Sequence, residues 1–163
     1  MTTQEGARLA DSIRQKVGEM NSLCKGLSEE TASRAPEGRW SPKQIISHLC
    51  GPEGRGLLPA LRLILEQDTP LLDLKAEDPF FTGKRTSMTM SELLAEFRNE
   101  YLQLADLVAG LSEVQLGRKA HIPMLKSTEL GEYPTLANFV GGLTDYHLEF
   151  HIRHMQEVMQ ALA

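Results

Sequence analysis

The sequence has few cysteines, few aromatic residues and no excess of positive charge. Two cysteines among 163 residues, Cys24 and Cys50, cannot build a disulfide framework or a cysteine-rich zinc site. Aromatic residues make up only 6% of the chain, and the net charge is −5. Binding to DNA or RNA needs a concentration of lysine and arginine, and the densest basic runs are isolated pairs, Lys84-Arg85 and Arg118-Lys119. We therefore expect no nucleic-acid partner.

Long hydrophobic runs are also lacking. The longest, from Leu57 to Leu65, is interrupted by Pro59 and Arg62 and falls far short of the roughly 20 residues that span a bilayer. The opening segment from Met1 to Ala10 is too polar for a secretory signal peptide. We expect a cytoplasmic protein with no membrane partner.

The length and the apolar content indicate a single domain over residues 1–163. Apolar residues make up 41% of the chain and are mainly aliphatic, which favours helices over sheet. Apolar residues recur at three- and four-residue steps in four segments: 4–26, 41–65, 89–110 and 135 to the C-terminus. The pattern predicts an all-α fold, a four-helix bundle, with long connections over 68–87 and 111–134.

The second segment has the strongest helix start in the chain. Ser41-Pro42-Lys43-Gln44 combines a serine N-cap, proline at the first helical position and glutamine three residues after the cap, which is a capping box. Gly51-Pro52 then predicts a kink or break before Gly56, because proline has no N–H to donate and its ring crowds the preceding turn. Pro59 is expected to repeat this problem before the helix continues to Leu65.

Three of the five histidines stand close together in the final segment. His151 lies about 40° from His147 around a helix of 100° per residue, and His154 lies about 20° to the other side. All three therefore share one stripe, which we expect to face the core because it also carries Leu143, Phe150 and Val158.

Spacing along the helix limits which of these histidines can share a metal ion. Ligand nitrogens on one ion lie roughly 3–3.5 Å apart, whereas His147 and His154 are separated by about 10.5 Å along the axis. His147 with His151, or His151 with His154, can bind one ion, and a third ligand must come from elsewhere. His48, in the capped helix, and His121, in a connection, are the remaining histidines. The alternative is that these are core histidines with satisfied hydrogen bonds.

Two blocks of the sequence resemble the DinB-like (DinB/YfiT-type) superfamily of metal-dependent proteins. One is residues 38–49, GRWSPKQIISHL, and the other is residues 146–154, YHLEFHIRH; residues 111–136 resemble the linker into the family's last helix. The resemblance implies an up-down-down-up bundle that binds one divalent ion, zinc or nickel, with open coordination positions. It assigns the metal ligands to His48, His147 and His151.

The resemblance also gives expectations about the surroundings of this site. His154 is expected beside the ligands. The family commonly places an acidic residue about a turn after its first histidine; here Cys50-Gly51-Pro52 intervenes before Glu53, which is a candidate neighbour of the site by its proximity in sequence. Tyr146 is close only in sequence and is expected to be a packing aromatic. Trp40 is expected to pack at the end of the bundle, and Cys50 to be a small buried side chain. Members of the family often form homodimers, so a dimer is expected.

Several functions are compatible with this pattern. A three-histidine ion with an open position would acidify water for hydrolysis, or stabilise the thiolate of a low-molecular-weight thiol co-substrate for transfer to a small-molecule substrate. The sequence identifies no catalytic acid or base. The alternatives are a non-catalytic or stress-related metal-binding bundle, and a metal-free helical interaction protein.

Overall fold

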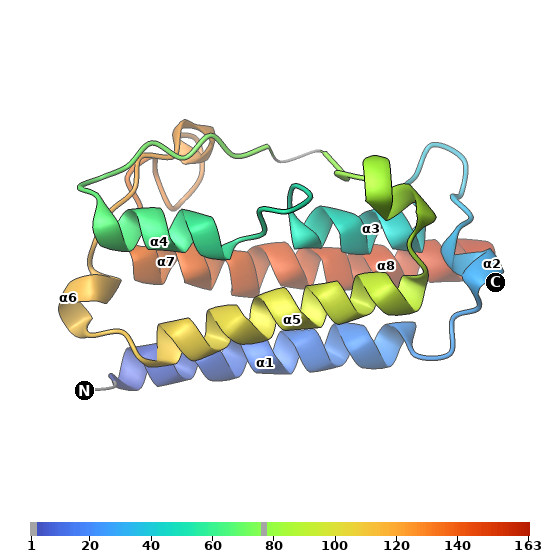
Figure 1. The fold of residues 1–163 in the computed structure, drawn as a ribbon, viewed down its shortest axis with the longest axis horizontal. Coiled ribbons are helices and arrows are strands. Elements are labelled where there is room, and N and C mark those ends of the chain that lie inside the picture. The colour runs from blue at the N-terminus through green and yellow to red at the C-terminus, as the bar shows by residue number, and fades with distance from the viewer. Residues whose placement is uncertain (1–2, 76–77) are drawn as a thin grey trace.

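The computed structural model describes residues 3–75 and 78–163. It is a bundle of four helical rods (Figure 1). The rods are α1 (Gln4–Cys24), α3 with α4 (Pro42–Cys50 and Leu58–Glu66), α5 (Met90–Ala109), and α7 (Leu136–Gly142) continued by η3 (Leu143–Leu148) and α8 (Glu149–Leu162). In Figure 1, α1 and the last rod run in one direction and the two middle rods run in the other, so the predicted up-down-down-up order is confirmed. Among the described helices, none is both long and apolar enough to cross a membrane.

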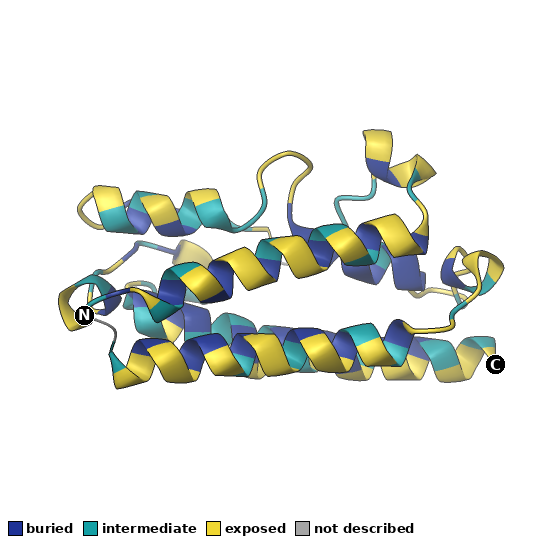
Figure 2. Ribbon diagram, turned by 60° about the horizontal axis from the view of Figure 1, so that its bottom comes forward, coloured by how far each residue is buried: buried dark blue, intermediate teal, exposed yellow. Residues whose placement is uncertain are grey.

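The core lies between the inward faces of these rods. Along α1 the residues at helical spacing are fully buried, and Phe97 and Tyr101 of α5 pack beside each other with ring centroids 4.9 Å apart. Figure 2 shows buried residues on the facing sides of the helices and exposed residues on the outside. Tyr101 also donates a hydrogen bond from its hydroxyl to the carbonyl of Leu49, which joins α5 to α3. The aliphatic composition therefore produces the helical core that it predicted.

The capping box predicted at Ser41 forms at the start of α3, and a second capping box forms at the start of α5. Ser41 Oγ accepts from the backbone N–H of Gln44, and the Gln44 side chain accepts from the N–H of Ser41. Thr89 and Glu92 make the same reciprocal pair at α5. Each box satisfies two backbone donors that a helix end would otherwise leave without a partner.

Replacing Ser41 by alanine is expected to lower the free energy of unfolding by about 1 kcal/mol, because the N–H of Gln44 loses its acceptor. Urea denaturation monitored by circular dichroism measures this change. Ser127→Ala, in an exposed connection, is the matched control and should leave stability within about 0.5 kcal/mol of the starting protein. Equal stability of the two variants would contradict the cap's contribution.

The predicted break between α3 and α4 is present, but Pro59 does not contribute to it. Helix α3 ends at Gly51, whose φ of 75° is favourable for glycine, and an irregular connection leads to α4. Pro59 is the second residue of α4. A proline in the first turn costs nothing, because its missing N–H would have no helical partner there. The expectation that Pro59 disrupts the helix is therefore wrong.

The long connections are more ordered than the sequence indicated. Their described parts contain the short helices η1 (Gly83–Ser87), α6 (Glu113–Leu116) and η2 (Pro123–Leu125), and another short helix, α2 (Glu29–Ala32), lies between α1 and α3. Isolated bridges join Leu71 to His121 and Lys119 to Thr135. The Arg118 guanidinium donates to the carbonyls of Ile64 and Gln67, at 2.7 Å each, and so ties the second connection to the end of α4.

The final rod is not the uninterrupted α-helix that the sequence predicted. Residues Leu143–Leu148 form a π-helical turn. The fully buried Thr144 donates its hydroxyl to the carbonyl of Val140 at 2.9 Å, and two glycines, Gly141 and Gly142, precede it. Glycine weakens the regular helix, and a hydroxyl bonded to the carbonyl four residues back is a known cause of local distortion. The angle of 100° per residue therefore does not apply across this turn.

Candidate metal centre

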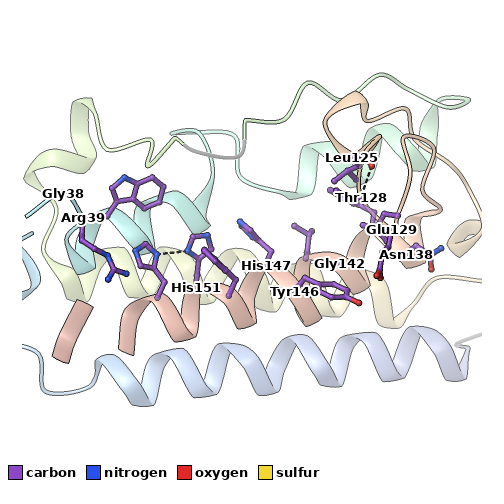
Figure 3. A pocket seen from close by; sticks show the side chains of 16 residues that line it. Gly38, Arg39, Leu125, Thr128, Glu129, Asn138, Gly142, Tyr146, His147 and His151 are labelled. Atoms are coloured by element: carbon purple, nitrogen blue, oxygen red, sulfur yellow. Dashed lines mark hydrogen bonds between the residues drawn. The ribbon is translucent and has the colours of Figure 1, made fainter. Parts of the chain in front are cut away.

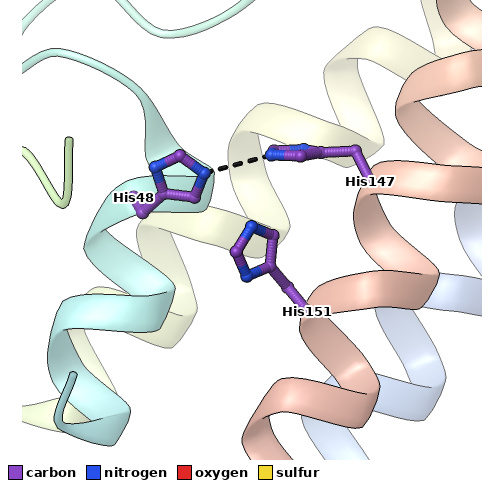
Figure 4. A group of neighbouring side chains, drawn as sticks. All are labelled: His48, His147 and His151. Carbon is purple, nitrogen blue, oxygen red and sulfur yellow. Dashed lines mark hydrogen bonds between the residues drawn. The ribbon is translucent and has the colours of Figure 1, made fainter. Parts of the chain in front are cut away.

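Three histidines from two rods meet at one point beside the core. His48 comes from the last turn of α3, His147 from the π-helical turn and His151 from α8 (Figure 4). Their ring centroids lie 5.1 Å apart for His48 and His147, and 4.7 Å apart for the other two pairs. One nitrogen from each ring lies within 4.8 Å of the other two. The structure thus brings together the three histidines that the resemblance assigned as ligands.

The backbone of a connection holds the His48 ring. Nδ1 of His48 lies 2.6 Å from the carbonyl oxygen of Asp78. Since a carbonyl only accepts, Nδ1 carries the hydrogen and the lone pair of the neutral ring is on Nε2. This Nε2 faces the Nε2 of His147 at 3.0 Å. Such an outer hydrogen bond is the arrangement that orients metal-binding histidines.

Burial keeps the other two rings neutral. It lowers the pKa of His147 to about 4, with a smaller contribution from the charge of His48. His151 is 4% exposed, and burial followed by the charges of His147 and His48 holds its pKa far below the ordinary value. Neutral imidazoles have a lone pair to give, so at pH 7 these rings are in the form that binds a metal ion.

The residues fit a divalent transition-metal ion. Two nitrogens already at 3.0 Å match the separation expected for ligands about 2.0–2.1 Å from one ion. Nδ1 of His147 is buried and has no hydrogen-bond partner, so hydrogen bonding within the protein does not fully account for this ring. Within the described part of the chain, no cysteine, aspartate or glutamate joins the three histidines at that distance. Three protein ligands leave coordination positions open, as in catalytic rather than structural zinc sites.

The three residues expected near the metal ligands, His154, Tyr146 and Glu53, have different surroundings in the structure. His154 lies beside His151, with their Nδ1 atoms 3.3 Å apart, and burial followed by the charge of Arg39 lowers its pKa. Tyr146 is 67% exposed, so the expectation of a packing aromatic is wrong. Glu53 is exposed, and its carboxylate lies against Gly83 in η1.

Two aromatic side chains also differ from the sequence predictions. Trp40 does not simply close the end of the bundle: its ring lies 5.2 Å from that of His48 and is stacked 6.4 Å from that of His151. Phe150 is 63% exposed, although the histidine stripe was expected to face the core. The buried residues of α8 are His151, Ile152, Met155 and Val158, so His151 itself lies on the buried side of the helix. Cys50 is fully buried as predicted, which raises the pKa of its thiol to about 12.

A cavity of about 1000 Å³ opens beside the histidines (Figure 3). His147, His151 and His154 are part of its wall, together with Arg39 and Trp40. Trp40 belongs to this wall, a position that its sequence context did not predict. Its position directly before the Ser41 cap was the available signal, since that cap begins the helix that carries His48. No sequence signal could reveal the Asp78 carbonyl, because every residue has one.

Comparison with known proteins identifies the class. Residues 13–155 match the sequence profile of the DinB superfamily, so the chain belongs to this superfamily. The fold is similar to that of YfiT from Bacillus subtilis, with a TM-score of 0.78 and 19% sequence identity, over 98% of this chain and 89% of that one. YfiT is described as a probable metal-dependent hydrolase with an unusual four-helix bundle topology. No curated protein matches the sequence.

Proposed function

We propose that this protein is a metal-dependent hydrolase whose single divalent ion, zinc or nickel, is held by His48, His147 and His151. The observation that carries the proposal is the convergence of three imidazoles, two of which, His147 and His151, line a large cavity. The all-nitrogen donor set suits zinc and nickel better than magnesium or calcium. The description of YfiT as a probable metal-dependent hydrolase supports the same activity.

The chain's own residues would orient and shield the reacting groups. The Asp78 carbonyl keeps the His48 lone pair directed at the centre, and His154 supports the ring of His151 from the side. Trp40 covers His48 and His151 and limits the access of water from that side. A divalent ion held by these residues would supply Lewis acidity, which would polarise a carbonyl or phosphoryl oxygen and make water a stronger acid.

The size of the cavity favours a second candidate, a thiol-dependent transfer. Sites for one small molecule span about 300–1,000 Å³, so a cavity of about 1000 Å³ has room for a substrate with a low-molecular-weight thiol. In this version the same ion would stabilise the thiolate of the co-substrate. The two reactions share the metal centre and differ in what attacks the substrate.

Metal analysis and cobalt substitution test the proposal on the untagged full-length protein. We expect about one ion per chain, ester or amide hydrolysis that stops on chelation and returns with zinc, and only a small loss of melting temperature when the ion is removed. No bound ion, or hydrolysis that chelation leaves unchanged, would contradict the proposal. A large fall in melting temperature without any activity would instead indicate a structural metal site.

Thiols separate the hydrolase from the transferase. Glutathione, bacillithiol and mycothiol are added in turn to the cobalt-loaded protein, and the ligand-field absorption bands are recorded. A thiolate that reaches the ion shifts these bands, because sulfur replaces an oxygen ligand. Bands that stay unchanged with all three thiols would exclude the transferase candidate and leave the hydrolase.

A further inference from the structure

The cavity is a groove that follows the final rod rather than a compact pocket. Figure 3 shows Arg39 at one end, Glu129 and Asn138 at the other, and His151 and His147 between them. The lining residues of the rod extend from Asn138 to His154, which corresponds to about 24 Å at 1.5 Å per residue. A molecule of two or three atoms would occupy only a small part of this length.

One arm of the groove is built from the segment that precedes the final rod. Leu125 and Leu130 of this segment line the arm opposite Phe139 and Leu143. Leu130 packs directly on the backbone of Gly142, where an added Cβ would lie 2.8 Å from its Cδ1 atom. The absence of a side chain at position 142 therefore lets the segment lie close over the rod and form the second wall.

The lining is mainly apolar and includes large rings that are open to solvent. Tyr146 and Phe150 are 67% and 63% exposed, and each directly precedes a histidine of the centre, His147 or His151. Exposed rings of this size beside a cavity are typical of binding surfaces, since an unliganded protein gains nothing by displaying them. The apolar and aromatic lining residues are Trp40, Leu125, Leu130, Phe139, Leu143, Tyr146 and Phe150.

Formal charge is confined to the two ends of the groove. Among the described residues that line it, Arg39 and Glu129 are the ones with charged side chains apart from histidine. Arg39 is bound to Glu157, with Nη2 and Oε2 2.9 Å apart, so its charge is already balanced. Glu129 disfavours an anion at the far end of the apolar arm. An uncharged body thus matches the groove better than an anionic one.

We propose that the substrate joins a polar reactive group to an elongated, uncharged, apolar body, an acyl chain or an aryl group. The reactive group lies at His147 and His151, and the body lies along the arm formed by Leu125, Leu130 and Leu143, beside the ring of Tyr146. This inference rests on the proposed metal centre for the place of the reactive group. The arm itself is a property of the apo chain.

Hydroxamates of graded length test this proposal, because their head group binds metal ions and their tail can enter the arm. Acetohydroxamate, octanohydroxamate and the monohydroxamate of suberic acid are titrated into the cobalt-loaded protein, and the cobalt absorption bands report binding. We expect the eight-carbon ligand to bind about 60-fold more tightly than the two-carbon ligand, if each of the six added methylenes loses roughly half of its contact with water. The terminal carboxylate of the suberic compound, directed at Glu129, should weaken binding by about 5-fold relative to octanohydroxamate.

Matched variants locate the tail. Tyr146→Ala should lower the affinity for octanohydroxamate by about 5-fold and leave the affinity for acetohydroxamate unchanged. Tyr133→Ala makes the same substitution at an exposed tyrosine that stacks on His121 outside the groove, and should change neither affinity. An equal effect of both variants would place the tail elsewhere and overturn the proposal.

A readout without metal separates this inference from the proposed function. Trp40 is the only tryptophan of the chain and lies on the groove, so its fluorescence reports octanohydroxamate in metal-free protein. If cobalt does not bind but Trp40 still responds to octanohydroxamate and not to acetohydroxamate, the metal centre fails and the apolar arm stands. If cobalt and acetohydroxamate bind but the longer chain adds no affinity, the arm fails and the metal centre stands.

Discussion

Replacing His147 by alanine is expected to lower zinc affinity more than 100-fold, because one of the three proposed protein ligands is lost. Loss of an outer hydrogen-bond partner alone typically costs 10–100-fold in metal affinity, and loss of a ligand costs more. The structure makes His147 the cleanest ligand to remove. Its Nε2 faces the Nε2 of His48 and its Nδ1 has no partner, so the substitution breaks little else in the protein. Zinc competition with a chromophoric chelator measures the affinity.

Two further histidines serve as controls for this variant. His121 lies in a connection, pairs with Glu132 at 3.1 Å and lines no part of the cavity, so His121→Ala should leave zinc affinity unchanged. His154→Ala should lower the zinc affinity by about 10-fold, because His154 contacts His151 but is not one of the three histidines whose nitrogens converge. Similar zinc affinities for the proteins lacking His147 and His121 would show that the ion binds elsewhere.

Replacing Arg85 by methionine is expected to lower the free energy of unfolding by about 3 kcal/mol. Arg85 is 1% exposed, and its Nη1 donates to the carbonyls of Ser47, at 3.0 Å, and of Gly51. Its Nη2 pairs with Glu96 of α5 at 3.0 Å. Methionine keeps most of the volume but leaves buried carbonyls at the end of α3 without donors, which costs about 1–3 kcal/mol per group. Urea denaturation of the metal-free protein measures the loss.

The same variant tests whether the end of α3 matters to the metal centre. His48 lies between the two residues whose carbonyls accept hydrogen bonds from Arg85. Loss of these bonds should make the end of α3 less rigid and so lower the zinc affinity, by roughly 10-fold. Arg98→Met, at an exposed position of α5, is the matched control and should change stability by less than about 0.5 kcal/mol. Unchanged stability after the loss of Arg85 would contradict its role at this helix end.

The helices and the pairing of His147 with His151 could be predicted because both depend on local chemistry. The capping box at Ser41 is encoded within four residues, and the spacing of His147 and His151 follows from one helical turn. Two features favoured His48 over His121 as the third histidine: its place in a capped helix and the family resemblance. The fold of the DinB superfamily then places the ring centroids of His48 and His147 5.1 Å apart, although the two residues are 99 positions apart in the sequence.

The errors arose where neighbours distant in sequence decide the local structure. The π-helical turn at Leu143–Leu148 changes the direction of side chains that a regular helix would place on one stripe. Phe150, in α8, lies in the groove wall instead of the core. Trp40 was expected at the end of the bundle, but the arrival of α8 beside α3 places its ring over two histidines. Neither contact is visible in a helical wheel, which contains no information about the opposite rod.

By itself, the sequence determined the all-α class, the helix starts and which segments carry histidines, because helix capping and hydrophobic periodicity act over one or two turns. Only the tertiary structure decided which nitrogens meet, which tautomer His48 adopts and which apolar side chains remain open to solvent. Those features depend on packing between rods and on backbone carbonyls such as that of Asp78, and packing is a property of the whole folded chain.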